Sequence, residues 1–204
     1  MVIDVLDAMR TTGALKSGHF LYASGRHGEV YLEKFDLLRN PVATVDLCAG
    51  FVGRFRDEGI DVVVGPTTGG IILAFETARQ LGVQAAYAER ASDGSSRREI
   101  RRGTTFEPGS RVLVVDDILT TGGSVRETLD ALEKHAVEII AVGVMVDRSS
   151  GNTTFGAVPL FALAAHEFAS WEVSDCPLCA QGIPLAKPGS SSTPLSQVTN
   201  PPRS

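Results

Sequence analysis

The sequence predicts an α/β fold built on a doubly wound, mostly parallel sheet. Between residues 40 and 146, short apolar runs of strand length alternate with segments whose apolar residues repeat at helical spacing. The run Val112–Val115 offers apolar side chains to both faces, which is typical of a strand covered by helices on both sides. With 204 residues, 43% of them apolar, the chain has the size and composition of one globular domain.

The first forty residues predict one helix and two strands. Ile3, Leu6 and Met9 lie at helical spacing within residues 3–16, and Gly13 is the expected stop of that helix. A weak alternation of apolar residues follows over residues 19–35. The polar turn 24–28 divides this alternation into two short strands.

The centre of the chain predicts three helices and four strands. One helix begins at Asn40-Pro41 and ends at Gly59, a second covers residues 71–81 and ends at Gly82, and a third covers residues 124–135. Strands are expected at residues 61–64, 84–88, 111–115 and 138–146. Beyond Lys187 the composition shifts to Pro, Gly and Ser, so residues 188–204 are expected to form a disordered tail.

Composition argues against several classes of protein. The 19 basic and 24 acidic residues give a net charge of −5, whereas a nucleic-acid-binding protein is usually basic. No apolar run approaches the roughly 20 residues that a membrane-spanning helix needs. The acidic N-terminus lacks the basic region of a secretory signal. Three cysteines are too few for a disulfide-built secreted fold and favour a reducing, cytoplasmic location.

The most informative segment covers residues 112–124. A buried strand ends at two adjacent acids, Asp116 and Asp117, and the loop Thr120-Thr121-Gly122-Gly123-Ser124 leads into the third helix. In open α/β sheets, ligands bind at the carboxyl ends of the strands. There the loop can offer backbone N–H groups, hydroxyls and a helix N-terminus to a phosphate, while the acids accept hydrogen bonds from vicinal sugar hydroxyls. The segment predicts a site for a phosphorylated sugar; a simple capped strand-to-helix turn is the alternative.

This segment resembles the phosphoribosyl pyrophosphate (PRPP) binding motif of the type I phosphoribosyltransferases. Within that family the chain resembles the orotate phosphoribosyltransferases over roughly residues 3–189, because four further segments occur in order: Ser24-Gly25-Arg26-His27, Val64–Gly70, Val146-Asp147-Arg148, and Cys176–Cys179 with the residues up to Gly189. The resemblance implies a Mg²⁺-dependent pentosyltransferase that converts orotate and PRPP to orotidine 5-phosphate and pyrophosphate in pyrimidine biosynthesis. It also implies a homodimer, and a single domain over residues 1–187 with a hood from about 1–38 and 155–187.

The resemblance assigns a role to each loop. Asp116 and Asp117 would hold the ribose hydroxyls, within a PRPP-binding segment that comprises Asp116, Asp117, Ile118, Leu119, Thr120, Thr121, Gly122, Gly123 and Ser124. The pyrophosphate loop would be Thr67, Thr68, Gly69 and Gly70, where the family often has a cis peptide. Arg148 would face the orotate carboxylate, with Thr120 and His27 as further contacts. Mg²⁺ would be held mainly by the substrate, without a dedicated protein site.

An arginine-rich segment, residues 90–103, predicts a mobile lid. It has five arginines against Asp93 and Glu99, a net charge of +3 in an acidic chain, and the small residues 94–96 make it flexible. Guanidinium groups suit the charge that develops on departing pyrophosphate. Arg97 and Arg98 are the expected catalytic cations beside the two acids, and the other lid cations are Arg90, Arg101 and Arg102. A charged surface hairpin is the alternative interpretation.

The loops lack basic residues that many family members have, and the Cys176–Cys179 pair has no role in the predicted reaction. Many members of the family carry a lysine in the pyrophosphate loop, and many carry lysines and a histidine in the lid. In this chain the pyrophosphate loop has no lysine, and the lid has neither lysine nor histidine. A phosphoribosyltransferase for another base, or a non-catalytic PRPP-sensing regulator, therefore stays open as an alternative. The Cys176–Cys179 pair supplies two zinc ligands rather than four, so a turn with two small side chains is expected, a metal site or a redox pair being the alternatives.

Overall fold

The computed structural model describes residues 4–22 and 24–188, which form two compact units. The larger unit contains Leu38–His166 together with Asp4 and Val5, and the smaller unit contains Leu6–Leu37 together with residues 167–188. Of the tail predicted over 188–204, all but Pro188 lies outside the described residues. Among the residues that the structure describes, no helix is both long and apolar enough to cross a lipid bilayer.

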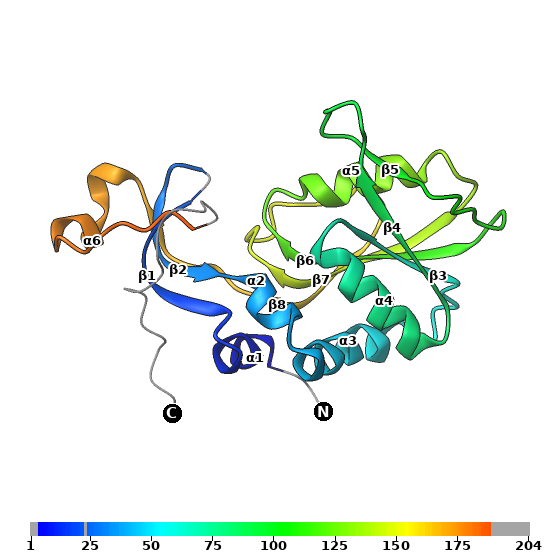
Figure 1. Ribbon diagram of the computed structural model, residues 1–204, viewed down its shortest axis with the longest axis horizontal. Helices are drawn as coiled ribbons and strands as arrows, with labels where there is room; N and C mark the ends of the chain where they lie inside the picture. Colours follow the sequence, from blue (N-terminus) through cyan, green and yellow to red (C-terminus); the bar gives the residue numbers. More distant parts are fainter. Residues whose placement is uncertain (1–3, 23, 189–204) are drawn as a thin grey trace. The chain divides into compact units, whose positions relative to one another are not determined.

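The larger unit is built on a six-stranded sheet, which confirms the predicted fold class. Its strand order is β5-β4-β3-β6-β7-β8, and only the edge strand β5 runs antiparallel to its neighbour (Figure 1). The strands are β3 (Val62–Pro66), β4 (Gln84–Arg90), β5 (Arg98–Ile100), β6 (Arg111–Leu119), β7 (Glu138–Asp147) and β8 (Leu160–Ala165). Because β3 lies in the middle and the chain moves outward in both directions, the sheet is doubly wound.

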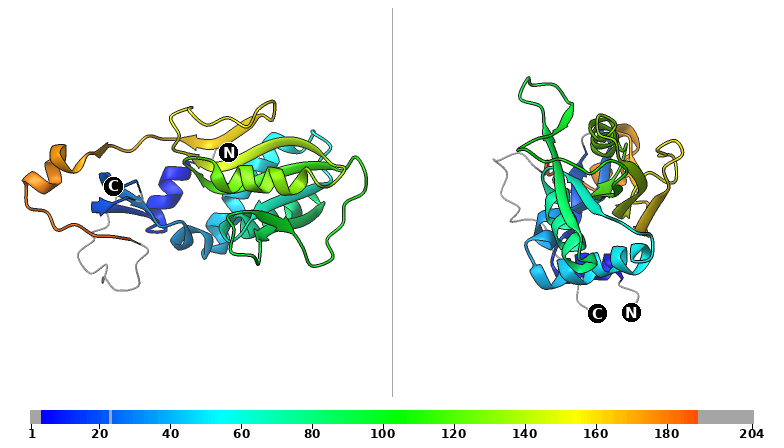
Figure 2. Two further views of the ribbon diagram at one scale, coloured as in Figure 1. Left: turned by 90° about the horizontal axis from the view of Figure 1, so that it is seen from above. Right: turned by 90° about the vertical axis from the view of Figure 1, so that its right-hand side faces the viewer.

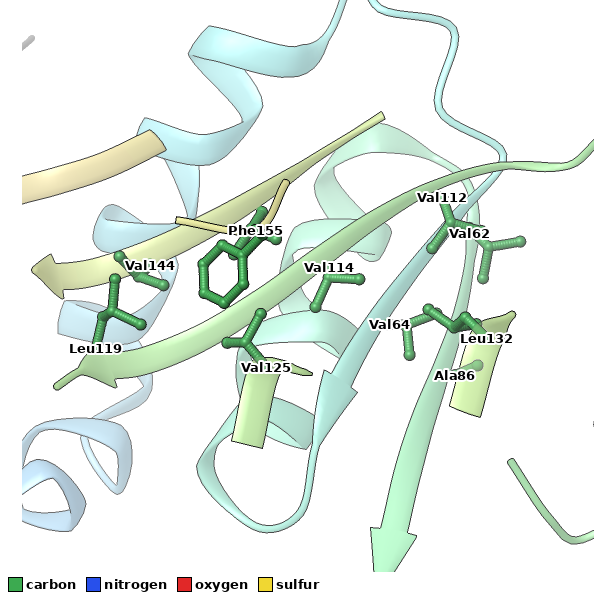
Figure 3. Close-up of a cluster of buried hydrophobic side chains, with 11 residues drawn as sticks. Val62, Val64, Ala86, Val112, Val114, Leu119, Val125, Leu132, Val144 and Phe155 are labelled. Carbon is green, nitrogen blue, oxygen red and sulfur yellow. The ribbon is translucent and has the colours of Figure 1, made fainter. Parts of the chain in front are cut away.

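Helices cover both faces of this sheet. The helices α3 (Pro41–Phe55) and α4 (Gly69–Leu81) lie on one side, and α5 (Gly123–Leu132) lies on the other (Figures 1 and 2). Alternate side chains of the central strands face α5, where valines of β3 and β6 pack with Val125 and Leu132 (Figure 3). On the opposite face, a Cβ at Gly143 would lie 3.1 Å from the ring of Phe51, which shows how closely α3 packs on β7.

Two of the signals that predicted helix ends are confirmed, whereas α3 ends at Phe55 rather than at the predicted Gly59 and α5 ends at Leu132 rather than at residue 135. Asn40 is the N-cap of α3, and its side chain accepts a hydrogen bond from the N–H of Ala43 at 3.2 Å, with Pro41 in the first turn. Gly82 ends α4 in the left-handed conformation, with φ 75°. These caps fix where α3 begins and where α4 ends.

The smaller unit joins both ends of the described chain in a three-stranded antiparallel sheet, β1-β2-β9. It contains α1 (Val5–Thr11), β1 (Leu15–Leu21), β2 (His27–Leu32), α2 (Lys34–Leu38), β9 (Ser170–Trp171), the 3₁₀ turn η1 (Val173–Asp175) and α6 (Pro177–Ala180). The predicted N-terminal helix and the two strands after it are therefore present. Lys16 and Asp36 form an ion pair of 2.5 Å between β1 and α2.

Several elements of the structure differ from the prediction, among them α2, β9 and α6, which were not predicted. β6 extends four residues beyond 115, so Asp116 and Asp117 lie within the strand rather than after it. The short strands β5 and β8 carry no strong alternation and were not predicted. The structure groups residues 155–166, which the resemblance places in a hood, with the larger unit, where β8 pairs with β7. The single-domain organisation with a hood stays a prediction.

Candidate active site

The two adjacent acids lie at the carboxyl end of β6 and are almost completely buried. Asp116 is 6% exposed and Asp117 is 3% exposed. The hydroxyl of Ser124 donates a hydrogen bond of 2.6 Å to Oδ2 of Asp116, and Oδ1 of Asp117 accepts one of 2.7 Å from the N–H of Ile118. The first turn of α5 and the end of β6 therefore hold both carboxylates in place.

The loop from Thr120 to Ser124 turns sharply from β6 into α5. Gly122 takes the left-handed conformation at φ 77°, and a Cβ there would lie 2.8 Å from Cγ2 of Thr153. Only glycine fits this position without strain. The tight turn leaves backbone N–H groups at the start of α5, where the helix dipole favours an anion.

A second layer of residues supports this loop from behind. The hydroxyl of Thr153 donates to the carbonyl of Thr120 at 3.1 Å, and Arg126 donates to the carbonyls of Thr121 and Thr154. The guanidinium of Arg126 also lies over the ring of Phe155, 5.4 Å from its centroid. These residues were not predicted, because Arg126 reads as an ordinary helix residue of α5 and the segment after β7, which holds Thr153 and Phe155, carries no motif that links it to the loop.

The predicted pyrophosphate loop follows β3 and adjoins the acids. The peptide bond between Thr67 and Thr68 is cis, as the resemblance implied, and α4 begins directly afterwards at Gly69. A Cβ at Gly69 would lie 2.0 Å from Oδ2 of Asp117. The start of α4 thus meets the carboxylate of Asp117 so closely that only glycine fits, and the two loops form one continuous rim.

Arg98, on the edge strand β5, is buried and reaches this rim. It is 5% exposed, and its Nη1 donates to the hydroxyl of Thr67 at 2.7 Å and to the carbonyl of Ala88 at 3.1 Å. Its Nε lies 3.2 Å from a carboxylate oxygen of Glu127 on α5. Burial lowers the pKa of Arg98, and the charge of Glu127 opposes that shift. The sequence predicted a role for Arg98, but it predicted neither the burial of this side chain nor its partner Glu127.

The other arginines of the predicted lid lie on an exposed hairpin formed by β4 and β5, whose turn projects from the sheet (Figures 1 and 2). Arg90 is exposed at the end of β4. The other three pair with acids of the same hairpin: Arg97 with Asp93, Arg101 with Glu99 at 3.8 Å, and Arg102 with Glu89 at 3.3 Å. A bound anion would have to compete with these acids for the guanidinium groups.

Arg148 lies at the same rim as the two acids. It follows β7, is half-buried, and its N–H donates to the carbonyl of Leu119 at 2.8 Å. The neighbouring carboxylate of Asp147 accepts the N–H of Ser149 at 2.7 Å. The predicted position of Arg148 beside the end of β6 is therefore confirmed, whereas its role toward a ligand stays a prediction.

His27, a further predicted base contact besides Arg148 and Thr120, lies in the smaller unit and is 4% exposed. Its Nδ1 lies 2.9 Å from Nε2 of His19 and 3.3 Å from Sγ of Cys179. The structure therefore brings His27 together with side chains that sequence analysis had not connected to it.

The geometry of the rim suits a phosphorylated sugar with an anionic leaving group. Buried carboxylates, small hydroxyl residues and the N-termini of α4 and α5 converge from the ends of β3 and β6. The donor set is also one that Mg²⁺ accepts, because the acids and hydroxyls offer hard oxygen atoms.

The chain is similar in sequence and in structure to known proteins. The family described as "Phosphoribosyl transferase domain" matches residues 43–178. An orotate phosphoribosyltransferase of Pelotomaculum thermopropionicum is 45% identical over 187 residues, covering 92% of this chain and 96% of that protein. One from Thermus thermophilus is 42% identical, covering 90% and 98%. The crystal structure of orotate phosphoribosyltransferase from Aeropyrum pernix matches with a TM-score of 0.67 at 26% identity, covering 79% of this chain and 93% of that one.

Proposed function

The chain belongs to the orotate phosphoribosyltransferases, pentosyltransferases of the type I family that serve pyrimidine biosynthesis, and from this premise we propose how its residues carry out the transfer. A ring nitrogen of orotate loses its proton to solvent and forms a bond to the anomeric carbon of PRPP, while the bond from that carbon to the pyrophosphate oxygen breaks and pyrophosphate leaves with the electron pair. The observation that carries the assignment of residues is the continuous rim formed by the loops after β3 and β6, where Gly69 adjoins Asp117.

PRPP binds along this rim. Asp116 and Asp117 accept hydrogen bonds from the two ribose hydroxyls, and the loop from Thr120 to Ser124 takes the 5-phosphate at the start of α5. Ile118 and Leu119 form the backbone that connects the acids to this loop. The hydrogen bond from Ser124 to Asp116 supports this proposal, since it fixes the acid and the loop relative to each other before a ligand arrives.

Pyrophosphate lies against the loop Thr67-Thr68-Gly69-Gly70. The anomeric carbon gains positive charge as the leaving group departs, and negative charge builds on pyrophosphate. Mg²⁺, held mainly by the oxygens of PRPP, supplies further positive charge to that leaving group when it is bound. Arg98 fixes the hydroxyl of Thr67, which supports a role in positioning this loop. Arg97 and the remaining lid arginines contact the phosphates once they leave their acids.

Orotate differs from the other nucleobases in its carboxylate, and we assign that carboxylate to Arg148. A guanidinium can take a carboxylate in two parallel hydrogen bonds. The backbone bond from Arg148 to Leu119 supports this assignment, because it holds Arg148 next to the PRPP segment. Thr120, exposed at the rim, is the second proposed contact.

We also propose a homodimer in the cytoplasm. The family resemblance implies it, and an apolar patch on α3 and α4 supports it. Val42 and Phe75 are 73% and 64% exposed, beside a hollow of about 360 Å³ that Ile71 and Ile72 help to line. A second copy of this chain is the proposed partner of this patch.

A turnover assay tests the function. Purified protein with PRPP, Mg²⁺ and orotate is expected to release pyrophosphate and orotidine 5-phosphate, and omission of Mg²⁺ is expected to stop the reaction. Adenine, guanine and uracil in place of orotate are the controls. If the protein prefers one of these bases, it is a phosphoribosyltransferase for that base. If it binds PRPP but turns over no base, it is the PRPP-sensing regulator.

A further inference from the structure

Four metal-binding side chains converge in the smaller unit, and His27 is the one among them that was also predicted to contact orotate. They are His19 of β1, His27 of β2, Cys176 and Cys179, and one ligand atom from each lies within 4.8 Å of all the others. We propose that this cluster binds a structural zinc ion. The proposal does not rest on the transfer reaction.

The distances within the cluster fit a tetrahedral ion. Nε2 of His19 lies 3.5 Å from Sγ of Cys176 and 3.7 Å from Sγ of Cys179, and Nδ1 of His27 lies 3.3 Å from Sγ of Cys179. Zinc bonds of about 2.0–2.1 Å to nitrogen and about 2.3 Å to sulfur place tetrahedral ligands roughly 3.3–3.8 Å apart. The 2.9 Å between the two ring nitrogens is shorter, so binding would move the imidazoles apart by a few tenths of an ångström.

A neighbouring carbonyl orients one imidazole for metal binding. Nδ1 of His19 lies 2.7 Å from the carbonyl oxygen of Ile183, to which it donates as N–H. Nε2 then carries the lone pair and points into the cluster. A backbone acceptor on the second nitrogen is the usual support of a histidine that binds a metal through the first.

The fold brings the four side chains together through backbone contacts on both sides of the cysteines. His19 lies where the register of β1 against β2 shifts, and such an irregularity redirects a side chain. Upstream of the cysteines, Trp171 pairs with His27. Downstream, the N–H of Ala186 donates to the carbonyl of His19 at 2.7 Å. The chain between these two contacts must therefore pass over the histidines.

Burial shows why this segment needs a metal. In residues 172–188, Cys176 is the one buried side chain, at 3% exposure, while Val173, Ile183 and Leu185 are 58%, 37% and 45% exposed. An apolar core cannot fix a segment that buries so little, and small units of this kind commonly rely on a metal or a disulfide. Four protein ligands of the Cys₂His₂ type leave no open position, so the ion is structural and does not bind substrate.

The four side chains fit a zinc site better than they fit a redox-active pair of thiols. Two thiolates and two imidazoles in tetrahedral arrangement are a typical zinc set. A dithiol that merely cycles through a disulfide has no need of two buried imidazoles directed at its sulfur atoms. Mg²⁺, which prefers oxygen ligands, does not suit this cluster.

Metal analysis of the full-length protein tests the proposal. After removal of loosely bound ions, the wild type is expected to hold close to one zinc ion per chain, and Cys176→Ser, Cys179→Ser and His19→Gln are each expected to lower that ratio at least tenfold. The chain offers matched controls in Cys48→Ser and His166→Gln, which should keep the wild-type ratio. Cys48 is buried in α3, and burial raises the pKa of its thiol to about 12.

A second measurement uses only the wild type, in case the cluster variants do not fold. Co²⁺ added to the zinc-free protein is expected to give the intense visible bands of a tetrahedral cobalt–thiolate site, which zinc should then abolish. The proposal is wrong if the wild type takes up no zinc, if Co²⁺ gives only the weak bands of an octahedral ion, or if the cysteine variants retain full zinc. Formation of a disulfide between the two thiols by a mild added oxidant in the presence of zinc, without release of any bound metal, would support the redox alternative instead.

Discussion

The guanidinium of Arg98 and the hydroxyl of Thr67 are joined by a hydrogen bond of 2.7 Å. This bond connects the edge strand β5 to the loop after β3, and Glu127 of α5 completes the link from the other side of Arg98. The predicted lid therefore has a buried base and an exposed outer part, and these two parts are expected to respond differently to mutation.

Arg98→Ala is expected to lower the free energy of unfolding by about 3 kcal/mol, because it leaves Glu127 without its buried partner. Arg97→Ala removes only an exposed ion pair with Asp93, so its effect on stability should stay below about 1 kcal/mol. Urea unfolding of both variants checks the difference. Equal stability of the two variants would show that Arg98 does not support the fold. In the turnover assay, Arg97→Ala should reduce kcat more than it changes the affinity for PRPP.

Asp117→Asn is expected to reduce kcat/KM for PRPP on the order of ten- to a hundredfold. It replaces a charged acceptor by a neutral one, and a hydrogen bond to a charged group is worth roughly 1.5–3 kcal/mol. Asp130→Asn is the control, since Asp130 is an exposed acid on the same crossover helix α5. Steady-state kinetics with varied PRPP compare them, and unchanged constants in Asp117→Asn would refute the proposed ribose contact.

Arg148→Ala is expected to lower kcat/KM for orotate by on the order of ten- to a hundredfold, with little change in PRPP affinity. Arg148→Lys keeps the charge but loses the two-pronged geometry, so it should recover only part of this loss. Initial rates at varied orotate, beside PRPP binding measured without orotate, separate the two effects. A uniform loss of PRPP affinity in both variants would show that Arg148 supports the loop and not the base.

Two adjacent glycines give a matched pair for the PRPP loop. Gly122→Ala forces an alanine to φ 77° and against Thr153, so it should cost roughly 1–2 kcal/mol of stability in the ligand-free protein. At Gly123 a Cβ would meet no atom closer than 3.8 Å, so Gly123→Ala should leave that stability nearly unchanged. Thermal unfolding without ligand measures both. If the two variants unfold at the same temperature, the conformation of Gly122 does not strain an alanine and this prediction is wrong.

The proposed homodimer predicts that Phe75→Glu shifts the protein toward the monomer, because it places a charge in the apolar patch of α3 and α4. Phe35→Glu, at a residue of α2 that is 41% exposed, should leave the dimer intact. Sedimentation at several protein concentrations measures the association. A wild type that stays monomeric would contradict the proposal directly.

Elements with strong local signals could be predicted from the sequence. The caps Asn40 and Gly82, the apolar run of β6, and the acids followed by a glycine-rich loop each carry their own physical cause in a few consecutive residues. β5 and β8 could not be predicted in this way. Both are short edge strands whose pairing depends on the neighbouring strand rather than on their own alternation.

The residues of the site likewise divide into those that a local motif predicts and those that only the tertiary structure reveals. Asp116, Asp117 and the cis peptide of the pyrophosphate loop follow from the motif and the resemblance, whereas Glu127, Arg126 and Thr153 act on the loops from elements distant in the chain. The histidine–cysteine cluster shows the limit most clearly. A single Cys-x-x-Cys gave two ligands, and only the tertiary structure supplies the other two, from residues about 150 positions earlier.

The smaller unit also constrains the order in which this protein can acquire its structure during synthesis. Nearly all of the larger unit is the single stretch Leu38–His166, which can fold as soon as it has left the ribosome. The β1–β2 hairpin emerges earlier, yet its two histidines must wait for cysteines that are translated near the end of the chain. The first segment to be made is thus among the last to be completed, and zinc supply at that late moment would decide how quickly a newly made chain matures.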